Sequence, residues 1–144
     1  MAPEEWTIRA AGGDDAAAVL DLWRVASSLP SVTDSEAGIE RLLRHDPRSL
    51  LVAAADDSVL GTLIAAWDGW RGSFYRLAVH PDWRRRGVAA SLVRAGEARL
   101  AGLGAIRLTA IVASDEAAAR LLWQSLGYAR QTNRSRFVRM LSQP

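Results

Sequence analysis

The residues with the clearest chemical potential lie in the segment LAVHPDWRRRGVAASL, residues 77–92. Its apolar start predicts a strand that stops at Pro81, and its end predicts a helix that begins at Gly87. The first amides of a helix have no partner within it and attract anions such as phosphate. Gly87 and Ala89 leave that backbone accessible, and Arg84–Arg86 add charge and forked donors. This pattern predicts a diphosphate site; the alternative is an ordinary helix start with three solvated arginines.

Two side chains beside this segment could act on a substrate. His80 follows the predicted strand, and because histidine titrates near neutral pH it could deprotonate an amine directly or through water. The alternative for His80 is a solvent-exposed turn residue. Tyr75 lies earlier on the same strand and could bind a substrate, or it could fill the core beside Leu77.

A predicted hairpin turn before this strand offers further candidates for substrate binding. Trp67 and Trp70 flank Asp68-Gly69, and we expect Trp83 to join them around the mouth of the site. An aromatic wall binds apolar or cationic groups, and Asp68 could attract an amine. The alternative is that the tryptophans pack against the hairpin and in one interface, and that Asp68 is present because Asp-Gly favours a tight turn.

Composition limits the chemistry that the chain can perform. The 144 residues fit one domain, residues 1–144, without cysteine for a disulfide, a nucleophile or an iron–sulfur cluster. All 18 basic residues are arginine, which excludes a Walker A lysine and a Schiff-base lysine. With only two histidines we expect no metal site. No segment approaches the ~18 apolar residues of a membrane span, and no signal-peptide pattern is visible, so we expect a cytoplasmic protein without a membrane partner.

Charge is distributed unevenly along the chain. Residues 1–68 contain 5 arginines and 12 acidic residues, whereas residues 69–144 contain 13 arginines and 4 acidic residues. A basic half favours a polyanionic partner, either nucleic acid or a phosphorylated small molecule. Charge alone does not choose between them.

Hydrophobic periodicity predicts a mixed-sheet α/β domain. The first strands form a meander, and the strand–helix–strand unit around residues 87–101 requires a parallel crossover. A capping box, Thr33-Asp-Ser-Glu36, opens the second helix. The predicted strands cover residues 6–9, 49–55, 59–67, 72–79, 105–112, 128–132 and 135–141, and the predicted helices cover residues 16–27, 33–45, 87–101 and 115–126. Tyr75, Leu77 and Val79 should share one face of their strand.

The pattern Arg84-x-x-Gly87-x-Ala89, after a Leu-Ala-Val-x-Pro strand end, resembles motif A of the GNAT N-acetyltransferase superfamily. The segment LWQSLGY, residues 122–128, resembles the end of that family's motif B helix, and the order of elements is similar along nearly the whole chain. Residues 67–72 are similar to a hairpin of small stand-alone bacterial members, the YpeA-like group. The resemblance implies a GNAT fold, with six to seven strands in a mixed central sheet, about four helices, and the order β-α-α-β-β-β-α-β-α-β-β.

The resemblance also implies acetyl-coenzyme A (acetyl-CoA) as co-substrate. Amides of residues 85–90 would hold the pyrophosphate, and strand 72–79 would pair with the pantetheine arm where it separates from strand 105–112. The N–H of Val79 would stabilise an oxyanion. The implied cofactor-binding residues are Leu77, Ala78, Val79, Arg84, Arg85, Arg86, Gly87, Val88, Ala89, Ala90, Glu116 and Trp123.

The chain departs from the family where acid–base chemistry is usually placed. Trp123 stands where many members have a tyrosine acid, and an indole N–H donates a hydrogen bond but is not a useful acid. Glu116 stands at a frequent asparagine position. Tyr75–Arg76 and Ile111 stand where other members place a glutamate base. The acid and base roles therefore stay unassigned, and Tyr75 and His80 are the candidates for catalysis.

The resemblance implies direct acetyl transfer from acetyl-CoA to a primary amine of a small molecule or peptide, by a monomer or homodimer. The missing acid and base motivate an alternative, a module that binds acyl-CoA or a partner without transfer. A third possibility is nucleic-acid binding through the basic half. The chain has no recognisable nucleic-acid-binding motif, so we expect no nucleic-acid partner.

Overall fold

The computed structural model describes residues 6–26, 31–113 and 116–142. The chain forms two compact units, Met1–Ala110 and Ile111–Pro144. Among the described residues, no helix is both long enough and apolar enough to cross a membrane.

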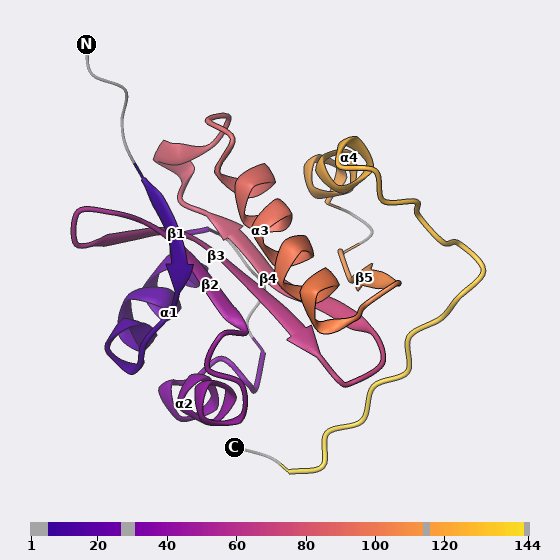
Figure 1. The fold of residues 1–144 in the computed structure, drawn as a ribbon, viewed down its shortest axis with the longest axis horizontal. Helices are drawn as coiled ribbons and strands as arrows, with labels where there is room; N and C mark the ends of the chain where they lie inside the picture. The colour runs from indigo at the N-terminus through magenta and orange to yellow at the C-terminus, as the bar shows by residue number, and fades with distance from the viewer. Residues whose placement is uncertain (1–5, 27–30, 114–115, 143–144) are drawn as a thin grey trace. The chain divides into compact units, whose positions relative to one another are not determined.

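The first unit is built on a five-stranded mixed sheet (Figure 1). Its order is β1-β2-β3-β4-β5, and the first four strands pair antiparallel while β5 runs parallel to β4. The strands are β1 (Thr7–Ala10), β2 (Leu50–Ala55), β3 (Ser58–Trp67), β4 (Gly72–Val79) and β5 (Leu108–Ala110). The meander and the parallel crossover that the sequence predicts are both confirmed.

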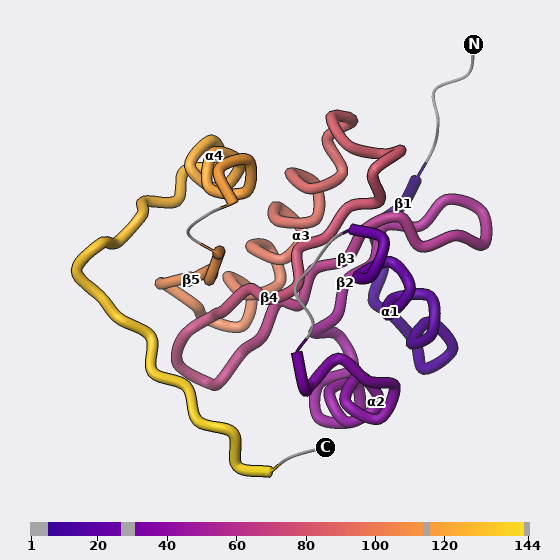
Figure 2. Tube along the Cα trace, turned by 180° about the vertical axis from the view of Figure 1, so that it is seen from behind, coloured from indigo at the N-terminus to yellow at the C-terminus, as the bar shows by residue number. Residues whose placement is uncertain are grey.

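Helices cover both faces of this sheet, as Figures 1 and 2 show from opposite sides. One face packs against α1 (Ala16–Val25) and α2 (Glu36–His45), which follow the 3-10 turn η1 (Gly13–Asp15). The other face packs against α3 (Val88–Leu103), which follows the 3-10 turn η2 (Pro81–Trp83). The apolar runs of β2 and β3 are buried because both of their faces are covered.

Close contact between α3 and the sheet depends on small residues. A Cβ added at Gly96 would lie 2.7 Å from Phe74 Cε1, and one added at Gly61 would lie 2.9 Å from Val88 Cγ1. These glycines let the helix lie close to β3 and β4. The packing fixes where α3 begins relative to the end of β4.

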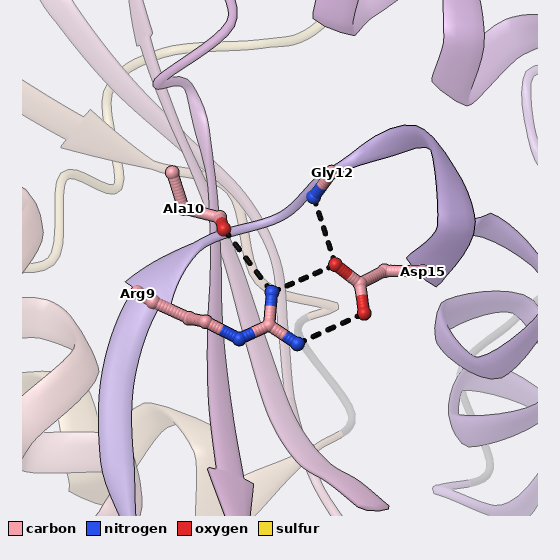
Figure 3. A network of polar contacts seen from close by, with 4 residues as sticks. All are labelled: Arg9, Ala10, Gly12 and Asp15. Atoms are coloured by element: carbon pink, nitrogen blue, oxygen red, sulfur yellow. Dashed lines mark hydrogen bonds and ion pairs between the residues drawn. The ribbon is translucent and has the colours of Figure 1, made fainter. Parts of the chain in front are cut away.

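Local contacts position the helices on the opposite face. Arg9 Nη1 and Nη2 donate to the two carboxylate oxygens of Asp15 at 2.7 and 3.0 Å, and Asp15 Oδ2 also accepts from Gly12 N at 2.8 Å (Figure 3). This network joins β1 to η1. The predicted capping box at Thr33 is wrong, because the N-cap of α2 is Ser35, whose hydroxyl accepts from Gly38 N at 2.9 Å.

The second unit contains α4 (Ala117–Ser125). Within it Tyr128 N donates to Trp123 O at 3.1 Å, and the two rings meet edge to face with centroids 5.0 Å apart. Residues 129–142 are exposed and form no strand, so the predicted closing hairpin is wrong and the sheet has five strands instead of six or seven. A hairpin without a buried face has too little apolar burial to be stable.

Candidate functional site

A β-bulge interrupts β4 at Arg76. Thr62 pairs with Ala78 but Ile64 pairs with Tyr75, so β4 contains one residue more than β3 over this stretch. Arg76 adopts the left-handed conformation, with φ of +54°, which non-glycine residues seldom occupy. The predicted shared face of Tyr75, Leu77 and Val79 is therefore wrong. Tyr75 lies opposite Ile64 on the α1 face, whereas Val79 lies opposite Gly61 on the α3 face.

The bulge also reverses the direction of the backbone amides. Before it, Gly72 N donates to Arg107 O at 3.1 Å, toward β5. After it, His80 N donates to Leu60 O at 2.8 Å, toward β3. Amides eight residues apart in a regular strand point the same way, so the bulge has shifted the alternation by one. Consequently the N–H of Val79, between Ala78 and His80, points away from β3.

Among the described residues, no strand pairs with β4 on the β5 side where this amide points. Among the described residues β5 pairs with β4 only over Gly72–Phe74, although the sequence predicts a strand from residue 105 to residue 112. Residues 75–79 thus extend past the end of β5 at Ala110. An unpaired strand edge presents amides and carbonyls that an extended ligand can pair with.

The loop after β4 is held by its own polar contacts. His80 Nδ1 accepts from Asp82 N at 3.1 Å and so caps η2. Asp82 Oδ2 lies 3.8 Å from the same nitrogen. His80 therefore caps the turn that follows β4.

The three arginines differ in their contacts. Arg84 Nε lies 3.4 Å from Val79 O, and Arg84 Nη2 donates to Ala26 O at 3.3 Å, so this side chain ties the loop to β4 and α1. Arg86 lies over the Trp83 ring at 4.9 Å. Arg85 is exposed and has a left-handed backbone.

The start of α3 offers backbone amides to an anion. Gly87, the N-cap, has φ of +82°, and a Cβ built there would meet no atom within 4 Å. The first bond of the helix runs from Ser91 N to Gly87 O at 3.0 Å, which leaves the amides of Val88, Ala89 and Ala90 without an acceptor in the helix. Open space at a left-handed glycine beside free amides fits a diphosphate group, and the β4 edge fits an extended amide chain such as pantetheine.

The other candidates lie at different places in the fold. Trp67, Asp68 and Trp70 occupy the β3–β4 turn, before β4, whereas Trp83 follows its far end. Eight strand residues span roughly 25 Å, so the structure does not bring the three tryptophans into one cluster. Asp68 Oδ1 accepts from Trp70 N and Arg71 N at 2.8 and 2.7 Å, and these backbone donors lower the pKa of its carboxyl.

Tyr75 is the predicted acceptor residue nearest the open edge. The residue is 44% exposed although it lies in an inner strand of the sheet. Glu116 and Trp123 belong to the second unit, where Glu116 is the exposed N-cap of α4. The bulge could not be predicted from the sequence, because no neighbouring residue types mark an arginine that will adopt a positive φ.

Two surface hollows of the first unit lie elsewhere. One is lined by η1 and α2 residues including Gly13, Glu40 and Arg44, and the other by Arg48, Leu51 and Leu103 among others. Neither includes a residue of the α3 start. Across residues 6–26, 31–113 and 116–142, no three histidine, aspartate or glutamate side chains are grouped so that they could hold a metal ion.

Comparison with known proteins gives consistent results. The model of the acetyltransferase (GNAT) family matches residues 17–128. An acetyltransferase of Yersinia pestis is 38% identical over 118 residues, which cover 82% of this chain and 84% of that protein.

Solved structures share the fold. The crystal structure of Ard1 from Thermoplasma volcanium has a TM-score of 0.78 at 22% identity and covers 86% of this chain and 82% of its own. The aminoglycoside N-acetyltransferase AAC(6')-Iy in complex with CoA has a TM-score of 0.76 at 20% identity, covering 99% of this chain and 100% of its own. The match to the family model and the Yersinia relative together show that this chain belongs to the acetyltransferase (GNAT) family.

Proposed function

We propose that this protein transfers an acetyl group from acetyl-CoA directly to a primary amine. The observation that carries the proposal is the open edge of β4, with the Val79 amide turned outward, followed directly by the free amides of α3. One element offers partners for an extended amide chain and the next offers partners for a diphosphate. Family membership supports the donor, and the CoA complex of AAC(6')-Iy is consistent with it.

Each part of this surface has its own task in the proposed reaction. The amides of residues 85–90 hold the pyrophosphate, and Arg85 adds positive charge beside them. The edge of residues 77–79 binds the pantetheine arm. The Val79 N–H donates to the acetyl oxygen as negative charge develops on it, which lowers the barrier to attack by the amine. The family resemblance adds Glu116 and Trp123 of the second unit as further proposed cofactor-binding residues.

Proton transfer does not need a dedicated carboxylate in this proposal. His80 Nδ1 is engaged with Asp82 N, and Tyr75 faces the α1 side of the sheet. We therefore infer that the amine loses its proton to solvent or arrives with a depressed pKa. A coenzyme A thiolate is a good leaving group, so a protein acid is dispensable at some cost in rate.

The acceptor is a small-molecule or peptide amine in this proposal. AAC(6')-Iy is an aminoglycoside acetyltransferase, and another structural neighbour from Escherichia coli acetylates the alanine of ribosomal protein S18. These neighbours are at most 21% identical, so they do not choose between the two classes. We also propose that residues 1–144 act as one domain, as monomer or homodimer, since the family match spans both units.

Nucleic-acid binding is less favoured because several arginines of the basic half are used internally. Arg76 pairs with Asp34, Arg99 with Asp46 and Arg94 with Glu97. Side chains engaged in this way are less available for phosphate backbones, which supply most nucleic-acid affinity. A non-catalytic acyl-CoA module remains the second candidate, favoured by Trp123 at the usual tyrosine position.

A turnover assay separates the enzyme from the non-catalytic module. The protein is incubated with acetyl-CoA and a panel of amines that includes aminoglycosides, amino acids, polyamines and peptides with free N-termini. We expect release of free thiol in step with an acetylated product, detected by mass spectrometry. Saturable acetyl-CoA binding with no acetylated product across the panel would favour the binding module instead.

A further inference from the structure

Four side chains from separate parts of the first unit meet at the β4 bulge. They are Trp23 of α1, Asp34 before α2, Thr62 of β3 and Arg76 itself, and we call them the bulge clamp. Trp23 and Thr62 are 4% and 0% exposed. Buried polar groups need partners, and here these partners converge on a single residue of β4.

The clamp holds the backbone of Arg76. Thr62 Oγ1 accepts from Trp23 Nε1 at 2.9 Å and donates to Arg76 O at 2.9 Å. One hydroxyl thus links the indole of α1 to the carbonyl of the left-handed residue. Because this hydroxyl binds Arg76 O, the carbonyl is satisfied at the point where the β3–β4 register shifts.

The clamp also holds the side chain of the same residue. The Arg76 guanidinium lies over the Trp23 ring at 5.1 Å from its centroid, and Arg76 Nη2 forms an ion pair with Asp34 Oδ2. Both charged side chains are mostly buried, at 18% and 16% exposure. A non-glycine residue with positive φ persists only where its surroundings hold it, and here both its carbonyl and its side chain are held.

Resting on the function proposed above, we infer that Arg76 is a positioning residue for acetyl transfer. The bulge it forms is the reason that Val79 N–H points to the open edge of β4 instead of toward β3. With regular alternation Val79 N–H would bond β3, and the amide would be lost to an acetyl oxygen. The clamp therefore governs recognition of the acetyl group, while the amides of α3 hold the diphosphate independently of it.

The test removes the clamp hydroxyl without changing side-chain shape. Thr62→Val deletes the hydroxyl, and Thr62→Ser restores it as the conservative rescue. Ser49→Ala is the matched control. Ser49 is buried just before β2, and its hydroxyl donates to Asp46 O at 2.8 Å, away from the bulge. Trp23→Phe keeps an aromatic side chain, although a smaller one, and removes the indole donor, so it serves as a second variant if Thr62→Val does not fold.

Two readouts by nuclear magnetic resonance follow the bulge. In the ligand-free protein, the backbone coupling constant of residue 76 reports its φ. The protein is also titrated with CoA and with acetyl-CoA. The chemical-shift change of the Val79 amide then measures contact with the acetyl group, and the changes of Gly87–Ala90 measure contact with the diphosphate. Calorimetry adds the affinity for acetyl-CoA relative to CoA.

We expect the Val79 resonance to differ between the two ligands in the wild type, in Thr62→Ser and in Ser49→Ala. In Thr62→Val or Trp23→Phe the positive φ and this difference should both be lost. Affinity for acetyl-CoA relative to CoA should fall roughly 2- to 10-fold, the value of one hydrogen bond, with CoA affinity kept. A folded clamp variant with a wild-type Val79 response would overturn the inference alone. No response of Gly87–Ala90 to CoA in the wild type would overturn the proposed function, and the inference with it.

Discussion

Gly87 combines a left-handed backbone with open space at the start of α3. A Cβ there would add strain of about 1 to 2 kcal/mol and would occupy the space through which an anion approaches the amides of α3. We predict that Gly87→Ala weakens CoA binding about tenfold or more, since charge-assisted hydrogen bonds are lost. Isothermal titration and thermal unfolding measure the two effects.

The same helix provides a matched control at its other end. Gly104 has φ of +109° and likewise has no atom within 4 Å of an added Cβ. Gly104→Ala should cost similar stability and leave CoA affinity unchanged. Equal losses of affinity in the two variants would mean that Gly87 acts only through the fold.

Asp15 makes stability depend on pH. Its hydrogen bonds with Arg9 hold the pKa of its carboxyl below the usual value, and the Gly12 amide acts in the same direction. A folded-state pKa below the unfolded one adds stability above about pH 4, and this stability is lost as pH falls through the folded value. Asp15→Asn should therefore lower the free energy of unfolding by about 1 kcal/mol at pH 7.

Urea denaturation at pH 7 and at about pH 3 or below checks this prediction. The difference between the wild type and Asp15→Asn should shrink toward zero in acid. Asp14→Asn, at the exposed neighbouring position, is the control and should change stability little at either pH. A pH-independent loss in Asp15→Asn would show that the ion pair with Arg9 contributes nothing.

At the scale of elements, α3 is positioned by the surface it presents to the sheet. The Cβ of Gly96→Ala would lie 2.7 Å from Phe74 Cε1, so overpacking should destabilise the protein by roughly 1 to 3 kcal/mol. Gly102 lies in the same helix with no atom within 4 Å of an added Cβ. Gly102→Ala should instead stabilise by about 0.5 to 1 kcal/mol, because alanine favours helix over glycine.

Chemical denaturation measures the change in the free energy of unfolding of Gly96→Ala and of Gly102→Ala, which should have opposite signs. Opposite changes would establish that α3 lies as close to β4 as described, which the site requires. Stabilisation by both substitutions would mean that α3 is able to move away from the sheet, and the fixed relation between Val79 and Gly87 would then be lost.

The sequence predicts most elements because their signals are local. Helical spacing of apolar residues predicts α1 and α3 from residues 16–27 and 87–101, within a few residues of their bounds. The Asp68-Gly69 turn likewise predicts the β3–β4 hairpin. The strands predicted within residues 128–141 do not form, because strand-like residues still need a partner strand and a buried face. Ile106, in the predicted start of β5, is 98% exposed for the same reason.

The site itself was only partly predictable. The start of α3 has a sequence pattern. The outward Val79 amide instead depends on a bulge that is held by two long-range contacts, one between residues separated by 39 positions and one between residues separated by 42. A single sequence contains no signal for such contacts. The predicted meeting of Trp67, Trp70 and Trp83 fails because β4 separates them.

On the scale of the whole molecule, the proposed ligand surface is built from adjacent elements of the first unit. The end of β4, the loop of Arg84–Arg86 and the first turn of α3 follow one another in the chain. The family match extends to residue 128 and so includes α4 of the second unit. We expect both units to be required for transfer, with diphosphate recognition residing in the first.

Isothermal titration of the purified full chain with acetyl-CoA tests this account most directly, with dephospho-CoA as a second ligand. The account predicts saturable binding to one site per chain, retained by the Gly104→Ala control and strongly weakened in Gly87→Ala. Dephospho-CoA should also bind, because the contacts proposed for the α3 amides are with the diphosphate. An absence of binding at millimolar acetyl-CoA would contradict the account and leave the α3 start as a plain helix terminus.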